Sequence, residues 1–355
     1  MRWRSLFFLL AFFACFAGNS PAQSGRSKPS PTPTPRSISG PSVATGPQTT
    51  PTPTIAASPQ TKKQDDDIIK VDSVLVPIPV HVTEPDGRPV RTLKLGDLEL
   101  KVDGKRVEIA ELVRSELPIR LAMLFDNSSS VLIAREFEKE AAVRFFKRVI
   151  RPDRDMAALF SVADYTRLEE PLTRDISLLA RAIDLFPEPK GATALLDGII
   201  KVAEYLKSTN GRRVIVIVSD GEDTYSDLRT MLDDVVRSLQ VSDCQVYVVR
   251  TKDFENMKRT GLRAGNANIR TLAAERRMLE ITQQTGGAVY SPINEDEMGE
   301  AFTQIAADLS EQYVLSYYPE EDASKPGEFR TIEVTVKGKE KLTVRARKGY
   351  YVPKR

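Results

Sequence analysis

The chain has 355 residues, enough for two ordinary domains, and its 41% hydrophobic and 28% charged residues are typical of a globular protein. Arg2 and Arg4 account for the formal net charge of +2, which leaves 49 of the 51 basic residues to balance 49 acidic ones. A neutral chain without a basic block is not expected to bind nucleic acid, because phosphate backbones are bound by clustered positive charge. The single histidine argues against mechanisms that need several imidazole groups.

The amino terminus has the pattern of an export signal. Two arginines precede a short apolar run at residues 6–18, and Ser20-Pro21-Ala22 supplies small residues suited to cleavage after Ala22. We therefore predict a signal peptide at residues 1–22 and an exported chain that is periplasmic, at the cell surface or secreted, with no transmembrane span after cleavage. Two alternatives remain open: an uncleaved anchor, for which the run is short, and a lipid at Cys15, which Phe12 disfavours.

Residues 23–66 are predicted to be a disordered linker. They are rich in Pro, Thr and Ser, with runs such as PSPTPTP and TTPTPT, and they hold almost no large apolar side chains. Such a segment cannot bury enough surface to offset the entropy lost on ordering.

Residues 67–116 read as β structure. Pro77 and Pro79 share one face of the first strand, which favours an edge strand, and His81 on that face is predicted to lie at the surface. A hairpin is predicted around Asp103-Gly104. The opposite face of the first strand is apolar at every second position: Val74, Val76, Ile78, Val80 and Val82.

Residues 117–311 alternate between strand and helix patterns. Continuous apolar strands are predicted at 119–125, 156–162, 214–218 and 244–249, and the segments between them have helical periodicity. This alternation predicts a mostly parallel sheet with helices on both faces, in which the strands ending at Phe125 and Ser219 are neighbours. Cys244 lies in an apolar strand and is predicted to be a buried core residue.

The period of two returns at residues 312–355, where three strands are predicted. Neither β-rich segment, 67–116 or 312–355, is long enough to close a core alone. We therefore predict an α/β fold class, with a Rossmann-like domain at 117–311 inserted in a small β-sandwich built from the flanking amino- and carboxyl-terminal strands.

Polar residues follow two of the predicted core strands. In an open α/β sheet, the loops at the carboxyl ends of the strands form the ligand crevice. Hard oxygen donors converging there suit Mg²⁺, or Mn²⁺ or Ca²⁺. Each residue alone is equally compatible with a helix cap or a turn, but their order and placement favour a metal site at an exposed strand end. The predicted metal ligands are Asp126, Ser128, Ser130, Thr193 and Asp220.

The motifs DNSSS, GAT and SDG, in this order, resemble the metal-ion-dependent adhesion site (MIDAS) of von Willebrand factor A domains over about residues 117–310. A longer resemblance, over 68–355, is to the bacterial "VWFA-related acidobacterial domain" family, with LKLGDLELKVDGKRVEI, LAMLFDNSSS, TGGAVYSP, EQYVLSYYP and VRARKGYY as landmarks. The resemblance implies that Ser128 and Ser130 bind a cation directly, Thr193 directly or through water, and Asp126 and Asp220 mainly through water. Ser129 stands at a non-ligand position. The neighbouring Glu222 and Asp223 are predicted to form a solvated acidic loop.

The sequence thus predicts an exported, metal-ion-dependent binding or adhesion module that captures a protein partner through an acidic side chain of that partner, and not an enzyme. A metal-dependent hydrolase is one alternative, with Asp126 as a phosphoryl acceptor, although no paired general base and no G-x-x-x-x-G-K loop is present. A structural envelope protein with a purely stabilising metal is the other. A binder needs an open coordination position, whereas a structural site is closed by protein ligands.

Overall fold

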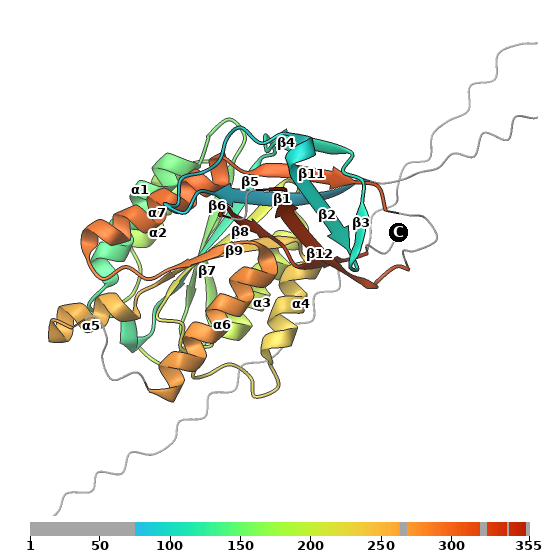
Figure 1. Ribbon diagram of the computed structural model, residues 1–355. Coiled ribbons are helices and arrows are strands. Elements are labelled where there is room, and N and C mark those ends of the chain that lie inside the picture. The colour runs from blue at the N-terminus through green and yellow to red at the C-terminus, as the bar shows by residue number, and fades with distance from the viewer. Residues whose placement is uncertain (1–74, 263–267, 320–324, 339–340, 353–355) are drawn as a thin grey trace, which may run out of the picture. The chain divides into compact units, whose positions relative to one another are not determined.

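The computed structural model describes residues 75–262, 268–319, 325–338 and 341–352 (Figure 1). The predicted signal peptide, with Cys15, and the predicted linker lie outside these residues. In the part of the chain that is described, no helix is both long enough and apolar enough to cross a membrane.

A six-stranded sheet forms the centre of the molecule, with the strand order β10-β9-β8-β5-β6-β7. β5 and β8 are neighbours, with Phe125 opposite Val218, as predicted. All pairs are parallel except β6 with β7. β7 was not predicted, because its residues are only partly buried and lack a clean alternation. The strands are β5 (Ile119–Asp126), β6 (Met156–Val162), β7 (Thr166–Thr173), β8 (Arg212–Ser219), β9 (Cys244–Arg250) and β10 (Ala288–Tyr290).

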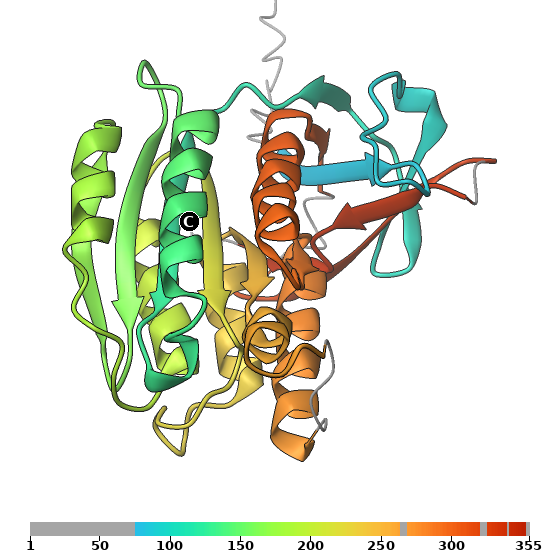
Figure 2. The ribbon, with the colours of Figure 1, turned by 90° about the vertical axis from the view of Figure 1, so that its left-hand side faces the viewer.

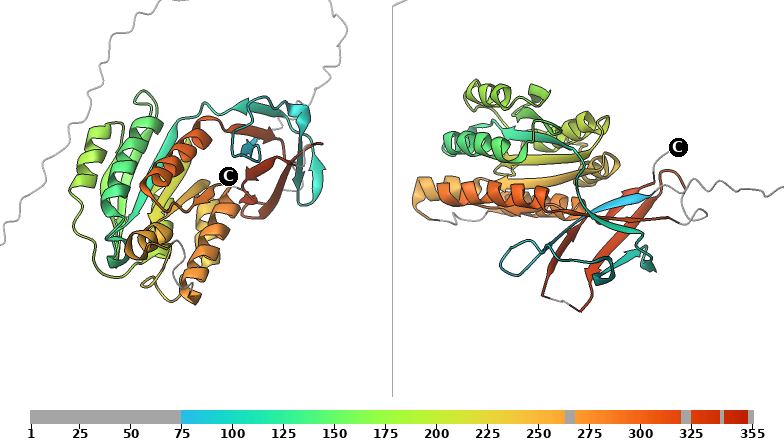
Figure 3. Two further views of the ribbon diagram at one scale, coloured as in Figure 1. Left: turned by 60° about the vertical axis from the view of Figure 1, so that its left-hand side comes forward. Right: turned by 90° about the horizontal axis from the view of Figure 1, so that it is seen from above.

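Helices cover both faces of this sheet (Figures 2 and 3). One face packs against α1 (Arg135–Val149), α2 (Ile176–Asp184) and α7 (Glu295–Ser310), and α5 (Lys252–Thr260) adds Phe254 to that core. The other face packs against α3 (Leu195–Lys207), α4 (Leu232–Val241) and α6 (Ile269–Thr285). Cys244 is buried in the second core, as predicted, and its burial raises the pKa of the thiol to about 12.

The flanking segments form two antiparallel sheets, β13-β1-β11-β4 and β14-β12-β2-β3. Each sheet combines strands from both ends of the described chain, and the two share one apolar core. The prediction that the two β segments pair around an inserted α/β domain is therefore confirmed. The amino-terminal strands are β1 (Val76–Thr83), β2 (Leu98–Val102), β3 (Lys105–Val107) and β4 (Glu111–Arg114); the carboxyl-terminal ones are β11 (Tyr313–Tyr317), β12 (Phe329–Val336), β13 (Thr343–Ala346) and β14 (Gly349–Tyr351).

The prediction that β1 is an edge strand was wrong. β1 lies between β11 and β13. However, β13 pairs only with residues 80–83, whereas β11 pairs with residues 76–80. Pro77 and Pro79 therefore lie in the half of β1 that has a neighbour on one side only, where a residue without an N–H is tolerated.

The prediction of a surface position for His81 was also wrong. Its side chain is 1% exposed, and its Nε2 atom lies 2.8 Å from Oδ1 of Asp308 in α7. Arg345 of β13 binds the other oxygen of the same carboxylate. The sequence pattern shows only that His81 shares a face with two prolines. It does not show that α7 of the inserted domain covers that face.

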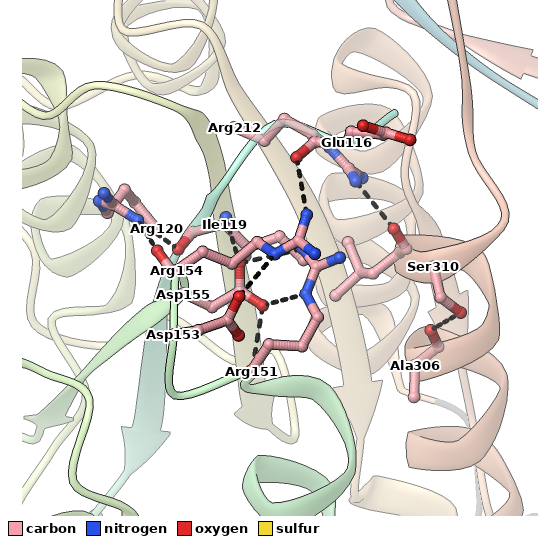
Figure 4. A network of polar contacts seen from close by, with 11 residues as sticks. Glu116, Ile119, Arg120, Arg151, Asp153, Arg154, Asp155, Arg212, Ala306 and Ser310 are labelled. Atoms are coloured by element: carbon pink, nitrogen blue, oxygen red, sulfur yellow. Dashed lines mark hydrogen bonds and ion pairs between the residues drawn. The ribbon is translucent and has the colours of Figure 1, made fainter. Parts of the chain in front are cut away.

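Asp155 fixes the amino end of β5 (Figure 4). It accepts hydrogen bonds from the backbone N–H of Ile119 at 2.8 Å and from the guanidinium of Arg151 at 2.6 Å. On the neighbouring strand β8, Arg212 donates to the carbonyl of Leu309 at the end of α7. Buried polar contacts of this kind hold the amino end of the central sheet in place.

Candidate metal-binding site

The candidate site lies where β5 and β8 end. Asp126 is the last residue of β5, and Asp220 follows the last residue of β8. Because these parallel strands are neighbours, their carboxyl ends meet at the same edge of the sheet. Thr193 precedes α3. The loop before it lies at the same edge, because backbone hydrogen bonds join residues 190 and 191 to residues 127 and 129 after β5.

Asp126 is fully buried, and the expectation of an exposed strand end was wrong. One carboxylate oxygen accepts a hydrogen bond from the backbone N–H of Ser128 at 2.9 Å, and the other accepts one from the hydroxyl of Ser219 at 2.6 Å. Burial, followed by the nearby charge of Asp220, raises the pKa of Asp126 to about 6. Two carboxylates therefore sit close enough to repel each other in a poorly hydrated place.

Ser128 and Ser130 place their hydroxyl oxygens 2.9 Å apart. Ser128 is buried, whereas Ser130 is exposed. Ser129, between them, instead directs its N–H toward the carbonyl of Gly191 at 3.3 Å. The hydroxyl groups of Ser128 and Ser130 thus face each other, whereas Ser129 faces the loop that carries Gly191.

The loop of Thr193 is clamped to the loop after β8. Its N–H binds the hydroxyl of Thr224, and its carbonyl accepts hydrogen bonds from the backbone N–H groups of Thr224 and Tyr225, each at 2.9 Å. Thr193 itself is buried. These bonds hold Thr193 against the loop that carries Asp220.

Asp220 has one satisfied and one unsatisfied carboxylate oxygen. Its Oδ1 accepts the backbone N–H of Glu222 at 2.9 Å, whereas its Oδ2 is buried without a hydrogen-bond partner. Lys252, the first residue of α5, places its Nζ atom 3.6 Å from that oxygen. Gly221 adopts a φ of 82°, which allows the chain to turn away directly after Asp220.

Several neighbours of the site were missed from the sequence. Ser219 was visible in the SDG motif but was not assigned a role, and Lys252 follows β9, the strand beside β8. The prediction of a solvated acidic loop was wrong. Glu222 binds Lys252 at 2.8 Å, and Asp223 accepts the N–H groups of residues 195 and 196, the start of α3.

The donor set fits a hard divalent cation. Carboxylates and hydroxyls are the ligands that Mg²⁺ accepts, and neither a thiol nor an imidazole stands among the five candidate residues. Oδ2 of Asp220 has no hydrogen-bond partner, and burial beside Asp220 raises the pKa of Asp126, so both carboxylates have unmet capacity to interact with a cation. Within the described residues no group of three or more His, Cys, Asp and Glu side chains could hold a metal. A cation here would therefore depend on the serine and threonine hydroxyls as well.

The part of the chain that holds these residues matches a known protein family. Residues 121–285 match the family model of the von Willebrand factor type A domain. The chain contains a von Willebrand factor type A (VWA) domain. The match spans the sheet from β5 to the end of α6, and so includes all five candidate ligands. No curated protein sequence matches the chain.

Solved structures similar to this chain include three other proteins. The PilB minor pilin from Streptococcus sanguinis has 13% identity and a TM-score of 0.42, over 56% of this chain and 63% of its own, so this chain spans less than two thirds of that pilin. The vWF domain of the type V pili tip protein Mfa5 from Porphyromonas gingivalis has 11% identity and a TM-score of 0.41, over 55% of this chain and 95% of its own. Proximal thread matrix protein 1 from the mussel byssus, with a zinc-occupied MIDAS motif, has 15% identity and a TM-score of 0.43, over 59% and 50%.

Proposed function

We propose that this chain is an exported binding module whose VWA domain holds a divalent cation at a MIDAS-type site. The cation would be Mg²⁺, or else Mn²⁺ or Ca²⁺. Through it, the domain would capture a protein partner that offers an acidic side chain. The observation that carries the proposal is the buried Oδ2 of Asp220, which has no hydrogen-bond partner and lies beside the buried Asp126. The proposed ligands are Asp126, Ser128, Ser130, Thr193 and Asp220.

The hydrogen bonds of the site support different roles for these ligands. Both oxygens of Asp126 already accept hydrogen bonds from the protein, which suits a carboxylate that reaches the cation through water. The paired hydroxyls of Ser128 and Ser130 suit direct ligands. When bound, a cation with few direct anionic ligands supplies a coordination position for an oxygen of another molecule.

The loops around the site support a protein partner rather than a purely stabilising metal. Four of these loops expose large apolar side chains: those after β5, β6 and β8 and the one after α2. Leu228 is 97% exposed. Large exposed apolar side chains on the loops around a site suit contact with another protein. The side chains are Leu132, Ile133, Tyr165, Leu185, Tyr225, Leu228 and Met231.

The hydrolase alternative has no observation in its favour. VWA domains are usually non-catalytic binding modules. Asp126 is buried with both oxygens hydrogen-bonded, which does not suit a phosphoryl acceptor. The only histidine of the chain, His81 of the β-sandwich, pairs with Asp308 in α7 of the inserted domain and is unavailable as a base at the site.

Export and domain limits belong to the same proposal. The signal peptide at 1–22 supports a periplasmic, cell-surface or secreted location. The proposed domain limits are 67–116 and 312–355 for the β-sandwich and 117–311 for the VWA domain. The landmarks between residues 68 and 355 support membership of the VWFA-related acidobacterial group.

The metal site can be tested by titrating the purified exported chain with Mg²⁺ by calorimetry. Ser130→Ala removes a proposed direct ligand at an exposed position, and we expect it to weaken binding at least about tenfold, or 1.4 kcal/mol. Ser129→Ala makes the same change one residue away, at a non-ligand position, and should bind like the wild type. Asp126→Ala should abolish binding. If all four proteins bind Mg²⁺ equally, the site is not the one proposed.

Partner capture is tested separately with envelope extract. Capture that EDTA and Ser130→Ala both abolish, and that Ser129→Ala preserves, supports the adhesion role. Capture that persists in EDTA would leave the metal site standing and remove the cation-mediated mechanism.

A further inference from the structure

Lys252 lies beside the candidate site because of the strand order. β9 pairs with β8, so Arg250 stands opposite Ser219, and the N–H of Thr251 binds the carbonyl of Ser219 at 3.0 Å. The next residue, Lys252, begins α5 and is mostly buried, with its side chain 23% exposed. Its Nζ atom lies 2.8 Å from a carboxylate oxygen of Glu222 and 3.6 Å from Oδ2 of Asp220.

From this geometry we infer that Lys252 is a built-in counter-ion, which competes with the divalent cation for Asp220 and thereby sets the affinity of the site. The inference rests on the proposed function and adds to it the residue that regulates metal binding. The ammonium group occupies the neighbourhood of the one carboxylate oxygen at the site that has no hydrogen-bond partner.

The other cationic side chains near the site make no ion pair with the Asp220 carboxylate. Arg135 of α1 donates to the carbonyl of Asp126 and to the side chain of Asn127, and it stacks over Phe186. Arg277 of α6 approaches only the carbonyl of Gly221, at 3.5 Å. Lys252 is therefore the cationic side chain placed to neutralise the Asp220 carboxylate while the site holds no metal.

The distances from Lys252 to Glu222 and to Asp220 indicate which of these two contacts a metal ion would replace. At 2.8 Å the contact with Glu222 is a charge-assisted hydrogen bond, whereas at 3.6 Å the contact with Asp220 is a looser ion pair. A divalent cation repels the ammonium and attracts Asp220 more strongly, because it carries twice the charge. Lys252 can keep its bond to Glu222 while it releases Asp220.

The test compares Mg²⁺ binding by Lys252→Met, Lys258→Met and the wild type, by calorimetry on the purified exported chain. Lys252→Met removes the charge and keeps an unbranched stem, and we expect it to bind Mg²⁺ about tenfold more tightly, or 1.4 kcal/mol. Lys258→Met is the matched control, since it removes the same charge from the same helix, where the lysine pairs with Glu295. It should stay within about twofold of the wild type.

Thermal unfolding of the metal-free proteins provides a second readout. Without Lys252 the buried Asp220 has no counter-ion, so metal-free Lys252→Met should melt at a lower temperature than the wild type, and saturating Mg²⁺ should raise its melting temperature by more. Lys252→Arg keeps the charge and should restore the stability of the metal-free protein. It serves as the check if Lys252→Met folds poorly.

The outcomes separate this inference from the proposed function. If the wild type binds no Mg²⁺, or binds it equally well as Ser130→Ala, the proposed function fails and the inference fails with it. If the wild type binds Mg²⁺ at the site but Lys252→Met binds it equally or more weakly, only the competition by Lys252 is overturned.

Discussion

Asp155 illustrates at the residue scale how hydrogen bonds determine the charge state of a buried carboxylate. Burial by itself would raise the pKa of Asp155, but hydrogen bonds from Arg151 and from the N–H groups of Ile119 and Arg151 lower it below the usual value. Asp126 shows the opposite balance, because burial and the charge of Asp220 outweigh the hydrogen bonds from Ser128 and Ser219. The difference lies in the charged neighbour, which is the cation Arg151 for Asp155 and the anion Asp220 for Asp126.

We expect Asp155→Asn to lower the free energy of unfolding at pH 7 by about 2 kcal/mol, because Arg151 loses its anionic partner. The pKa of Asp155 is lowered in the folded state, so its contribution is present above the ordinary pKa of 3.8 and is lost as the pH falls through the lower folded value. Urea unfolding followed by circular dichroism at pH 7, 4 and 2.5 should show the difference from wild type holding down to about pH 4 and shrinking below it.

Asp153→Asn is the control for that series. Asp153 is exposed and pairs only with Arg154 at 3.2 Å, so its loss should change stability by less than about 0.5 kcal/mol. A deficit of Asp155→Asn that stays constant from pH 7 down to pH 2.5 would contradict the argument.

At the scale of elements, the end of helix α6 is set by the turn that leads from it into the edge strand β10. Gly286 takes a φ of 79°, the left-handed conformation common at helix ends. A Cβ atom on Gly287 would lie 1.7 Å from the carbonyl oxygen of Val246 in β9. The close approach lets β10 pair with β9, so the end of the helix and the start of the strand depend on one another.

We expect Gly287→Ala to destabilise the protein by at least about 3 kcal/mol, because the methyl group would displace the β9 backbone. Gly299→Ala, in α7, is the matched change: a Cβ there meets nothing within 4 Å. It should stabilise the protein by about 0.5–1 kcal/mol, since alanine favours the helix. Thermal unfolding of both variants measures this, and equal melting temperatures would show that the close approach is not a constraint.

At the scale of the whole molecule, the β-sandwich packs at the amino ends of the central strands, opposite the candidate site. Gln312 binds Arg212 at the start of β8 and Gln245 near the start of β9. His81 and Arg345, from two strands of the sandwich, bind Asp308 of the inserted domain. Buried polar groups that span two parts stabilise only one relative placement, so the two parts are expected to unfold together.

We expect Asp308→Ala to lower the free energy of unfolding by about 3 kcal/mol, because it leaves Arg345 and His81 buried without an anionic partner. Glu300→Ala, at an exposed position of the same helix, should have little effect. Circular dichroism measures the unfolding. Calorimetry should show unchanged Mg²⁺ binding for folded Asp308→Ala, because the site lies at the other end of the sheet; a large loss of binding would contradict this separation.

The sequence by itself determined the parallel strands of the central sheet, the covering helices and the interrupted β-sandwich, but not the antiparallel strand β7. Each of these follows from a local pattern: continuous apolar runs in β5, β6, β8 and β9, and alternating residues in β1. The motifs around Asp126, Thr193 and Asp220 were also local, since each follows a strand or precedes a helix. Their assignment as metal ligands stays a prediction.

Only the tertiary structure decided which side chains meet from distant parts of the chain. His81 is buried because α7, more than 200 residues later, covers its face. Asp126 accepts the hydroxyl of Ser219 and has a pKa raised by Asp220 because β8, which ends at Ser219, lies beside β5. Lys252 reaches Asp220 because β9 lies beside β8. Burial and charge pairing are properties of neighbours in space, and periodicity along the chain specifies which face a residue occupies but not what packs against it.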